Sequence, residues 1–153
     1  MMVVGIAGLS MEEYRTHFSM WCVSAVPLWL GCDLSAQNES VLDIVRNEEL
    51  IAVNQDAWGF GAMQLDGLHS AQNNTEVWWK VLQPSDGEAT ANAVMLWNTD
   101  GQNAHAMQVA FWEIGLNGAA TVRDLWLHKD LGVMSNFTAT VPPHGCVVLR
   151  VAQ

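Results

Sequence analysis

A short apolar run, Pro27-Leu-Trp-Leu-Gly-Cys32, is the most informative stretch of this sequence, because it contains no polar side chain. Such runs are typical of strands that are covered on both faces, as in parallel sheets. Asp33 follows directly at the carboxyl end of the run. We therefore predict a buried parallel strand over residues 27–32.

Amphipathic helices are predicted on both sides of this strand. Before it, Ser10 and Glu13 have the spacing of a capping box, and apolar residues then recur at three- and four-residue steps. This pattern predicts a helix over about residues 11–25, which Pro27 ends. A second helix is expected over about residues 39–46. Helix, buried strand and helix together form a fragment of an α/β architecture.

From about residue 60 the pattern changes to the period-two alternation of β-strands. In the run 76–81, the alternation places Trp79 in the core and Trp78 on the surface. Four further strand-like runs, separated by turns rich in Gly and Asn, lie at 91–98, 106–111, 137–141 and 146–151. Short strands at this spacing predict an antiparallel β-sandwich.

Composition excludes several classes of partner. The chain has 153 residues, half of them hydrophobic, which is enough for one substantial core. It carries 6 Lys and Arg against 16 Asp and Glu, for a net charge of −10, which opposes contact with nucleic acid or an anionic membrane surface. The longest apolar run is also too short for a membrane helix. We expect no nucleic acid and no membrane as partners.

The cysteines and histidines do not have the spacing of a metal site, so no metal and no cofactor is expected. For Cys22, Cys32 and Cys146 two interpretations stay open. A Cys22–Cys32 disulfide is one, and buried free thiols are the other, which is favoured because free Cys is among the most buried residue types. His105, His128 and His144 have no carboxylate or Cys at ligand spacing.

The first 56 residues cannot complete a parallel sheet by themselves. A strand over 27–32 needs a neighbour on each edge and cover on each face, and no other stretch of the sequence supplies parallel partners. This part of the chain therefore has the pattern of the end of a larger α/β unit. Its apolar surface predicts that the isolated chain associates, either as a homo-oligomer or with a missing N-terminal portion of that unit.

Five segments of the sequence carry a family resemblance: Met11–Trp21, Ala25–Leu34, Val53–Asp56, Thr121–Trp126 and Val141–Gly145. The first three resemble the C-terminal third of α-galactosidases, the melibiase-type retaining glycoside hydrolases, and the last two resemble the terminal domain of these enzymes. The resemblance implies a (β/α)8 barrel with an antiparallel β-sandwich packed behind it. It also implies hydrolysis of terminal α-D-galactosyl residues from oligosaccharides or glycoconjugates.

On this pattern, residues 1–57 are the C-terminal remnant of the catalytic barrel and residues 58–153 are the sandwich domain. Residues 1–5 would be the end of the seventh barrel strand, and residues 27–32 the eighth strand. The fold class expected is thus an α/β fragment, the last strand and helices of a barrel, followed by an all-β antiparallel sandwich.

The resemblance also implies that this chain lacks the catalytic pair. The family uses two aspartates, a nucleophile and an acid/base, and both of their motifs are expected upstream of residue 1. Met1 matches a substrate-contacting position, the last residue of the family's Trp-Asn-Asp-Pro-Asp-Met segment, and is the only substrate-binding residue that we expect here. We therefore expect the chain to be inactive by itself, and to be a truncated gene product, a fragment that begins at an internal Met or one piece of a split enzyme.

Two aspartates keep alternative roles. Asp33 lies where barrel enzymes place catalytic groups, but capping of a loop or helix explains it equally well. Asp56 is expected in a turn and in hydrogen bonds between the two parts of the chain.

An alternative function is a non-catalytic sandwich that binds carbohydrate or stabilises a partner barrel, since tryptophan faces pack well on sugar rings. The sequence pattern assigns Trp21, Trp79 and Trp97 to the core. It marks Trp58, Trp78 and Trp112 as the tryptophans to be exposed.

The compartment stays open. Asn38, Asn73 and Asn136 each begin an Asn-X-Ser/Thr triplet, which agrees with relatives that are secreted, lysosomal or vacuolar. The N-terminal residues, however, do not have the pattern of a signal peptide.

Overall fold

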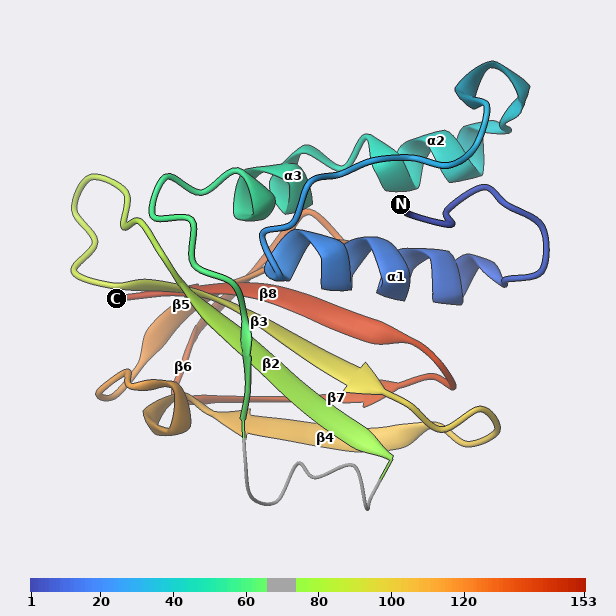
Figure 1. The fold of residues 1–153 in the computed structure, drawn as a ribbon. Coiled ribbons are helices and arrows are strands. Elements are labelled where there is room, and N and C mark those ends of the chain that lie inside the picture. The colour runs from blue at the N-terminus through green and yellow to red at the C-terminus, as the bar shows by residue number, and fades with distance from the viewer. Residues whose placement is uncertain (66–73) are drawn as a thin grey trace.

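The computed structural model describes residues 1–65 and 74–153 of the chain and shows three layers (Figure 1). The helices form one layer, a large sheet the second and a small sheet the third. Asn73, which begins one of the glycosylation-type triplets, lies outside the described residues. The helices are α1 (Met11–Val23), α2 (Glu39–Val45) and α3 (Glu48–Asn54), with short 3-10 turns η1 (Leu34–Ala36) and η3 (Phe111–Ile114). The strands are β1 (Met63–Gln64), β2 (Thr75–Leu82), β3 (Ala91–Asn98), β4 (His105–Ala110), β5 (Ala120–Asp124), β6 (Lys129–Met134), β7 (Asn136–Val141) and β8 (Cys146–Ala152).

The strands form the expected antiparallel sandwich. The large sheet has the order β1-β2-β3-β8-β5-β6, and the second sheet pairs β4 with β7. Every pair of neighbouring strands is antiparallel. The last strand, β8, therefore lies between β3 and β5 in the middle of the large sheet.

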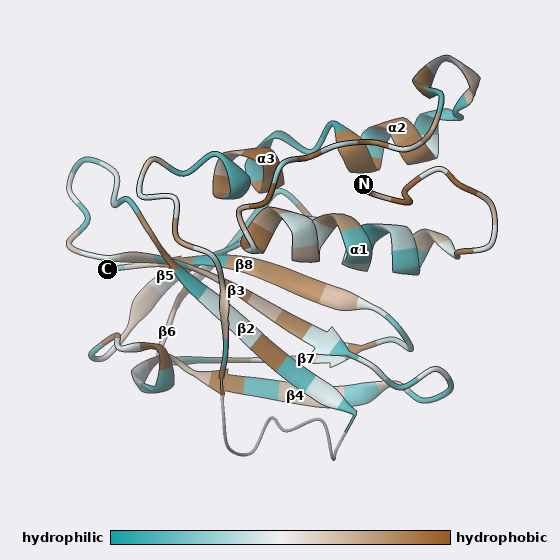
Figure 2. Ribbon diagram, in the orientation of Figure 1, coloured by the Kyte–Doolittle hydropathy of each residue, from teal (hydrophilic) through white to brown (hydrophobic). Residues whose placement is uncertain are grey.

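Two hydrophobic cores lie on opposite faces of the large sheet. One is the inter-sheet core, in which Leu96 and Leu149 pack with Phe111 from the second layer. The other is the helix-sheet core, in which Phe18 of α1 packs with residues of β3 and β8 such as Met95. Because helices cover its outer face, β3 is buried on both sides along almost its whole length. Apolar residues accordingly follow one another without alternation in β3 and β8 (Figure 2).

The predicted parallel strand over 27–32 is not formed as a strand. It is reduced to a single parallel bridge between Met2 and Leu30, in which the Met2 amide donates to the Trp29 carbonyl at 2.6 Å and the Gly31 amide donates to the Met2 carbonyl at 3.0 Å. Residues 1–5, expected as the end of a barrel strand, contribute only this bridge. The reason is the lack of partners, because within the described residues no further strand lies beside either segment.

The helices differ from the expected ranges at their ends. The capping box of α1 is confirmed, with Ser10 N donating to Glu13 Oε2 at 2.7 Å and Glu13 N donating to Ser10 Oγ at 3.2 Å. The helix ends at Val23, two residues earlier than expected, because Ala25 takes a left-handed conformation with φ of 54°. Asn47 begins a further helix, α3, for which no expectation was made.

The prediction that Trp78 is a surface residue is wrong. Trp78 is partly buried against the helix-sheet core, and its neighbour Lys80 is only 1% exposed. The alternation in β2 is real, but the face that it marks as polar is covered by the helices instead of water. Burial lowers the pKa of Lys80, whose ammonium donates to the Val53 carbonyl of α3 at 2.9 Å. Trp79 is partly buried against the inter-sheet core.

The three cysteines are free thiols, as favoured from the sequence, but only Cys22 is fully buried. Burial raises the pKa of the Cys22 thiol to about 12. Among the described residues, none of the helices has both the length and the apolar character needed to cross a bilayer.

Candidate functional site

The first candidate region is the rim, which we define as residues 1–8 and 30–37. It contains the Met2–Leu30 bridge and the loops that follow it. Met1 is 74% exposed, and its side chain lies over Gly31, where an added Cβ would come within 3.1 Å of the Met1 methyl group. The loops that follow the two segments also touch, because a Cβ on Gly5 would meet the amide of Gln37 and the thiol of Cys32. Met1 is therefore exposed to solvent on the rim, at a place where the two segments lie close together.

Asp33 on this rim acts as a cap. Its carboxylate accepts hydrogen bonds from the Ser35 amide at 2.9 Å and from the Ser35 hydroxyl at 2.7 Å. These bonds begin the 3-10 turn η1 and hold the pKa of Asp33 below its ordinary value. Of the two roles that the sequence left open, the capping role is the one that the structure shows.

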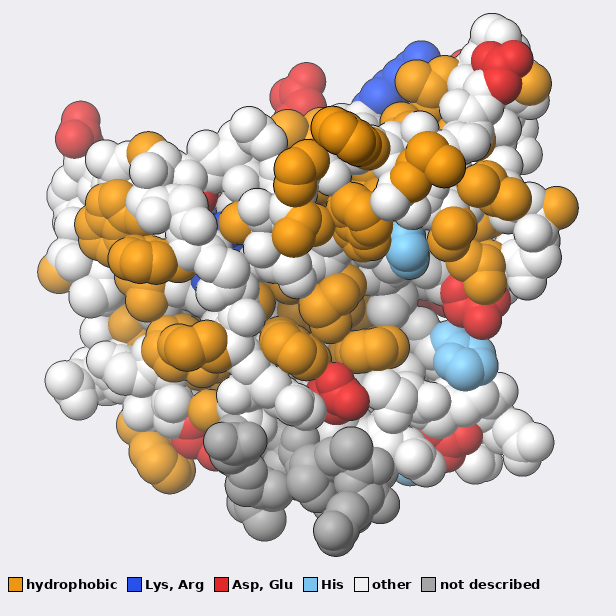
Figure 3. Space-filling view, in the orientation of Figure 1, with side chains coloured by type: hydrophobic (Ala, Val, Ile, Leu, Met, Phe, Trp, Pro, Cys, Tyr) orange, Lys and Arg blue, Asp and Glu red, His pale blue; other side chains and the backbone are white. Residues whose placement is uncertain are grey.

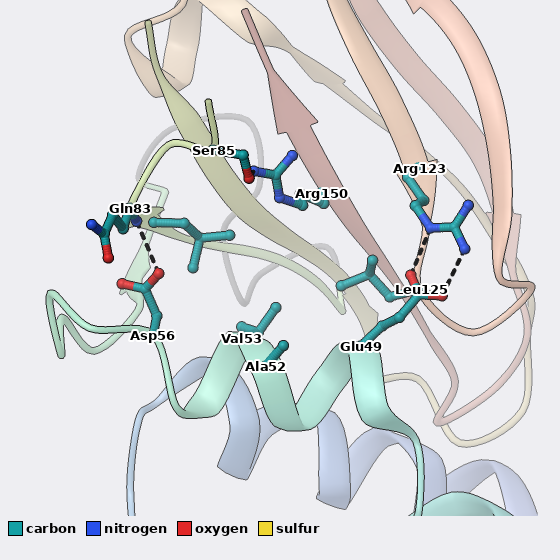
Figure 4. A pocket seen from close by; sticks show the side chains of 10 residues that line it. Glu49, Ala52, Val53, Asp56, Gln83, Ser85, Arg123, Leu125 and Arg150 are labelled. Atoms are coloured by element: carbon teal, nitrogen blue, oxygen red, sulfur yellow. Dashed lines mark hydrogen bonds and ion pairs between the residues drawn. The ribbon is translucent and has the colours of Figure 1, made fainter. Parts of the chain in front are cut away.

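Asp56 joins the helical layer to the sandwich, as expected. One carboxylate oxygen accepts from the Trp58 amide at 3.1 Å within a turn, and the other accepts from the Gln83 amide at 2.9 Å (Figure 4). Gln83 directly follows β2, so this single side chain ties the end of α3 to the end of a strand. Both oxygens are occupied by structural bonds.

A cavity of about 490 Å³ opens between α3 and the large sheet, next to Asp56. Figure 4 shows Val53 and Ala52 on α3 facing it, with Arg123 and Arg150 on strands opposite. The remaining lining residues are Glu49, Asp56, Leu82, Gln83, Ser85 and Leu125. We call this the inter-layer pocket.

Both arginines of the inter-layer pocket are already paired. Arg123 forms a two-point ion pair with Glu49 at 2.7 and 2.8 Å. Arg150 does the same with Glu88 at 2.6 and 2.7 Å. These guanidinium groups hold the pKa of each glutamate below its usual value. Because the charges neutralise one another, the pocket has the character of a structural joint rather than an anion site.

Two of the histidines that the structure describes are paired with carboxylates. His128 lies 2.7 Å from Glu49, and His105 lies 3.0 Å from Asp100. The sequence analysis expected neither pair: Glu49 and His128 are 79 positions apart, and Asp100 lies five positions before His105. Within residues 1–65 and 74–153, no three His, Cys, Asp or Glu side chains are grouped as a metal site.

The exposed tryptophans agree only in part with expectation. Trp58 and Trp112 are exposed, as predicted, at 46% and 74%. Trp29 is also 72% exposed, because the segment that carries it has a partner on one edge only. Exposure of Trp29 was not expected, since the apolar pattern around it is that of a buried strand.

The fold has two parts, an antiparallel sandwich and a helical layer that covers one of its faces. In comparison with known proteins, each part matches a family model. Residues 72–151 match the family model described as the alpha galactosidase C-terminal beta sandwich domain. Residues 1–56 match the model described as alpha galactosidase A. The chain therefore belongs to the α-galactosidase family.

Individual relatives agree with this assignment. The chain is 38% identical to an alpha-galactosidase of Oryza sativa over 95% of its own length and 33% of the relative. It is 37% identical to one of Cyamopsis tetragonoloba over 95% of its length and 34% of the relative. The chain thus spans about a third of the length of the curated relatives that it matches.

Solved structures share the fold. Alpha-galactosidase I from Mortierella vinacea superposes with a TM-score of 0.85 at 28% identity, covering 98% of this chain and 38% of that one. The alpha-galactosidase from Saccharomyces cerevisiae with raffinose superposes at 0.83 with 20% identity, covering 99% and 46%, a likeness of fold alone.

Proposed function

We propose that this chain is the C-terminal part of an α-galactosidase, and that it serves the hydrolysis of terminal α-D-galactosyl residues once joined to the rest of a barrel. The observation that carries the proposal is the order of the two family matches, 1–56 and then 72–151, which together account for the helical layer and the sandwich. α-D-Galactosides are the substrate class that the names of the relatives suggest.

The same proposal divides the chain into residues 1–57, a barrel remnant, and residues 58–153, the sandwich. The parallel bridge between Met2 and Leu30, which α1 connects along the chain, supports a barrel origin for the first part. Met1 is proposed as a substrate contact, which its exposure on the rim supports.

The isolated chain is proposed to be catalytically inactive. Retaining glycosidases need two carboxyl groups about 5–5.5 Å apart on either side of the scissile bond. The carboxylates that the sequence singled out, Asp33 and Asp56, are instead engaged as a cap and as a joint between layers. These structural roles support the proposal that the catalytic pair comes from outside this chain.

A chimera tests the proposal. The first two-thirds of the rice relative, which this chain does not cover, is fused to residues 1–153 and assayed with p-nitrophenyl α-D-galactoside, with the intact rice enzyme as reference. The chimera is expected to release p-nitrophenol and the chain alone is not. Turnover by the chain alone would contradict the proposal, as would a folded chimera without activity. Met1→Ala in the chimera is expected to raise KM, while Trp112→Ala, in the 3-10 turn η3 that follows β4, leaves it unchanged.

A further inference from the structure

A second cavity, of about 290 Å³, lies between α1 and the end of β3. We call it the aromatic groove and define it by Glu13, Thr16, His17, Trp21, Trp97 and His144. It shares no lining residue with the inter-layer pocket. Figure 3 shows hydrophobic side chains gathered on this face between the helical layer and the sheet, with histidine side chains beside them.

The two indole rings of the groove come from different layers. Trp21 lies on α1 and stacks on His17, with ring centroids 5.8 Å apart. Trp97 lies on β3, where it is paired with Cys146 of β8 on one side and Glu76 of β2 on the other. Both indoles are partly buried against the helix-sheet core, so each is held by packing while part of its surface stays open.

The groove has two kinds of polar group, the neutral imidazole of His17 and the carboxylate of Glu13. The Nε2 atom of His17 accepts from the Val3 amide at 3.3 Å, which assigns the ring proton to Nδ1 and leaves the ring neutral. Burial lowers the pKa of His17 and so favours this form. Glu13 is held as a carboxylate by its hydrogen bonds to Ser10, with His144 nearby adding to the effect.

The mouth of the groove is fixed by one hydrogen bond between layers. The hydroxyl of Thr16 donates to the His144 carbonyl at 2.7 Å, which ties α1 to the turn between β7 and β8. His144 takes a left-handed conformation with φ of 55°, and its ring lies against Gly101. The groove is therefore formed before any ligand arrives.

We propose that the aromatic groove binds one neutral pyranose ring, at a site separate from the barrel's active site. Flat indole faces suit the C–H faces of a sugar, and the carboxylate of Glu13 and the imidazoles suit its hydroxyls. The volume is at the small end for a ligand pocket and fits a single ring. An anionic ligand is opposed, because the lining has no Lys or Arg and the chain carries a net charge of −10.

The proposal rests on the proposed function only for the choice of galactose as the first sugar to test. Calorimetric titration of the full chain with methyl α-D-galactopyranoside is expected to give saturable 1:1 binding. Trp97→Ala is expected to weaken binding about tenfold or more. His144→Asn is expected to weaken it severalfold without disturbing the turn, since Asn tolerates positive φ. Trp112→Ala, an exposed indole outside the groove, is the matched control.

Three results would overturn the proposal. They are the absence of saturable binding up to the solubility limit of the sugar, equal affinity in Trp97→Ala and wild type, and loss of binding in Trp112→Ala alone. Trp97→Phe guards against a folding defect, because it keeps an aromatic face and is expected to restore part of the affinity. If Trp97→Ala unfolds, His144→Asn and Trp97→Phe still decide the outcome.

The chimera separates this inference from the proposed function. A chimera that hydrolyses substrate, together with an isolated chain that binds no sugar, rejects the groove and keeps the enzyme assignment. Binding by the isolated chain that disappears in the chimera would show that a protein segment occupies the groove in the whole enzyme. That result would overturn the sugar site as a feature of that enzyme.

Discussion

The N-terminal part of the chain and the sandwich are built from equally apolar sequence, yet they bury it to very different degrees. In the sandwich, β3 and β8 have a neighbour on each edge and a core on each face. In the N-terminal part, the helices pack on the large sheet, but the segments before and after α1 share a single bridge. Large apolar side chains are exposed along these segments: Met1, Val3, Ile6, Leu9, Val26, Trp29 and Leu34. An apolar sequence therefore predicts a buried strand, but the strand is buried only where neighbouring strands pair with it and other layers cover it.

The comparison predicts that the helices unfold together with the sandwich, although they match the part of the α-galactosidase family that precedes the sandwich domain. Phe18→Ala removes a side chain that is 1% exposed in the helix-sheet core and is expected to cost about 3–5 kcal/mol of unfolding free energy. Leu96→Ala, in the inter-sheet core, is the matched change and is expected to cost about 2–5 kcal/mol. Urea unfolding followed by circular dichroism is expected to show one shared transition. A second transition that Phe18→Ala leaves unmoved would mean that the layers unfold independently.

Two helix caps offer a sharper test of the joint. Asn47 caps α3 and also donates to the Leu125 carbonyl of the sandwich at 2.9 Å, while Asn38 caps α2 only. Asn47→Ala is expected to cost about 2–3 kcal/mol, because it also strands a buried carbonyl. Asn38→Ala is expected to cost about 1 kcal/mol. Equal losses in thermal unfolding would contradict a role for Asn47 between the layers.

The ion pair of Glu49 with Arg123 makes the joint sensitive to acid. The pKa of Glu49 is lowered in the folded chain, so its stabilising effect is present above the ordinary value of 4.5 and is lost as the pH falls through the folded value. Glu49→Gln is therefore expected to flatten the fall of unfolding free energy below about pH 4.5. Glu39→Gln serves as control, because Glu39 pairs with Arg46 at the open surface. A profile that is unchanged by Glu49→Gln would show that the pair does not couple the layers.

The smallest effect on stability is expected at Trp29. Trp29→Ser changes a side chain that is 72% exposed, so the unfolding free energy should move by no more than about 0.5 kcal/mol. Its effect on self-association should be larger, since it lies among the exposed apolar residues of the N-terminal part. Sedimentation velocity is expected to show less association than in wild type. Trp112→Ser, an equally exposed change on the sandwich, is expected to leave association unaltered, and the opposite ranking would contradict the comparison.

Local patterns in the sequence were sufficient for most elements. The alternation of Met107 and Val109 marks the buried face of β4, and the capping box at Ser10 marks the start of α1. Each of these signals is made by residues only a few positions apart along the chain, so each can be found without knowing the fold.

Contacts between layers could not be predicted in this way. Lys80 reads as a surface lysine until α3 is known to cover β2 and to offer the Val53 carbonyl. The pair of Glu49 with Arg123 joins positions 74 residues apart, and no periodicity connects them. The rim was predicted from resemblance, and the aromatic groove required the placement of α1 over the sheet.

The central position of β8 sets the order of events during synthesis. Residues 146–152 are made after β3 and β5, yet both of these strands hydrogen-bond to them, one on either side. Until that moment the nascent polypeptide holds two open β-edges and an uncovered set of α1 contacts, which is the condition under which chains pair with the wrong neighbour. Closure of the large sheet therefore waits for residues 146–152, however early the other strands of that sheet are made.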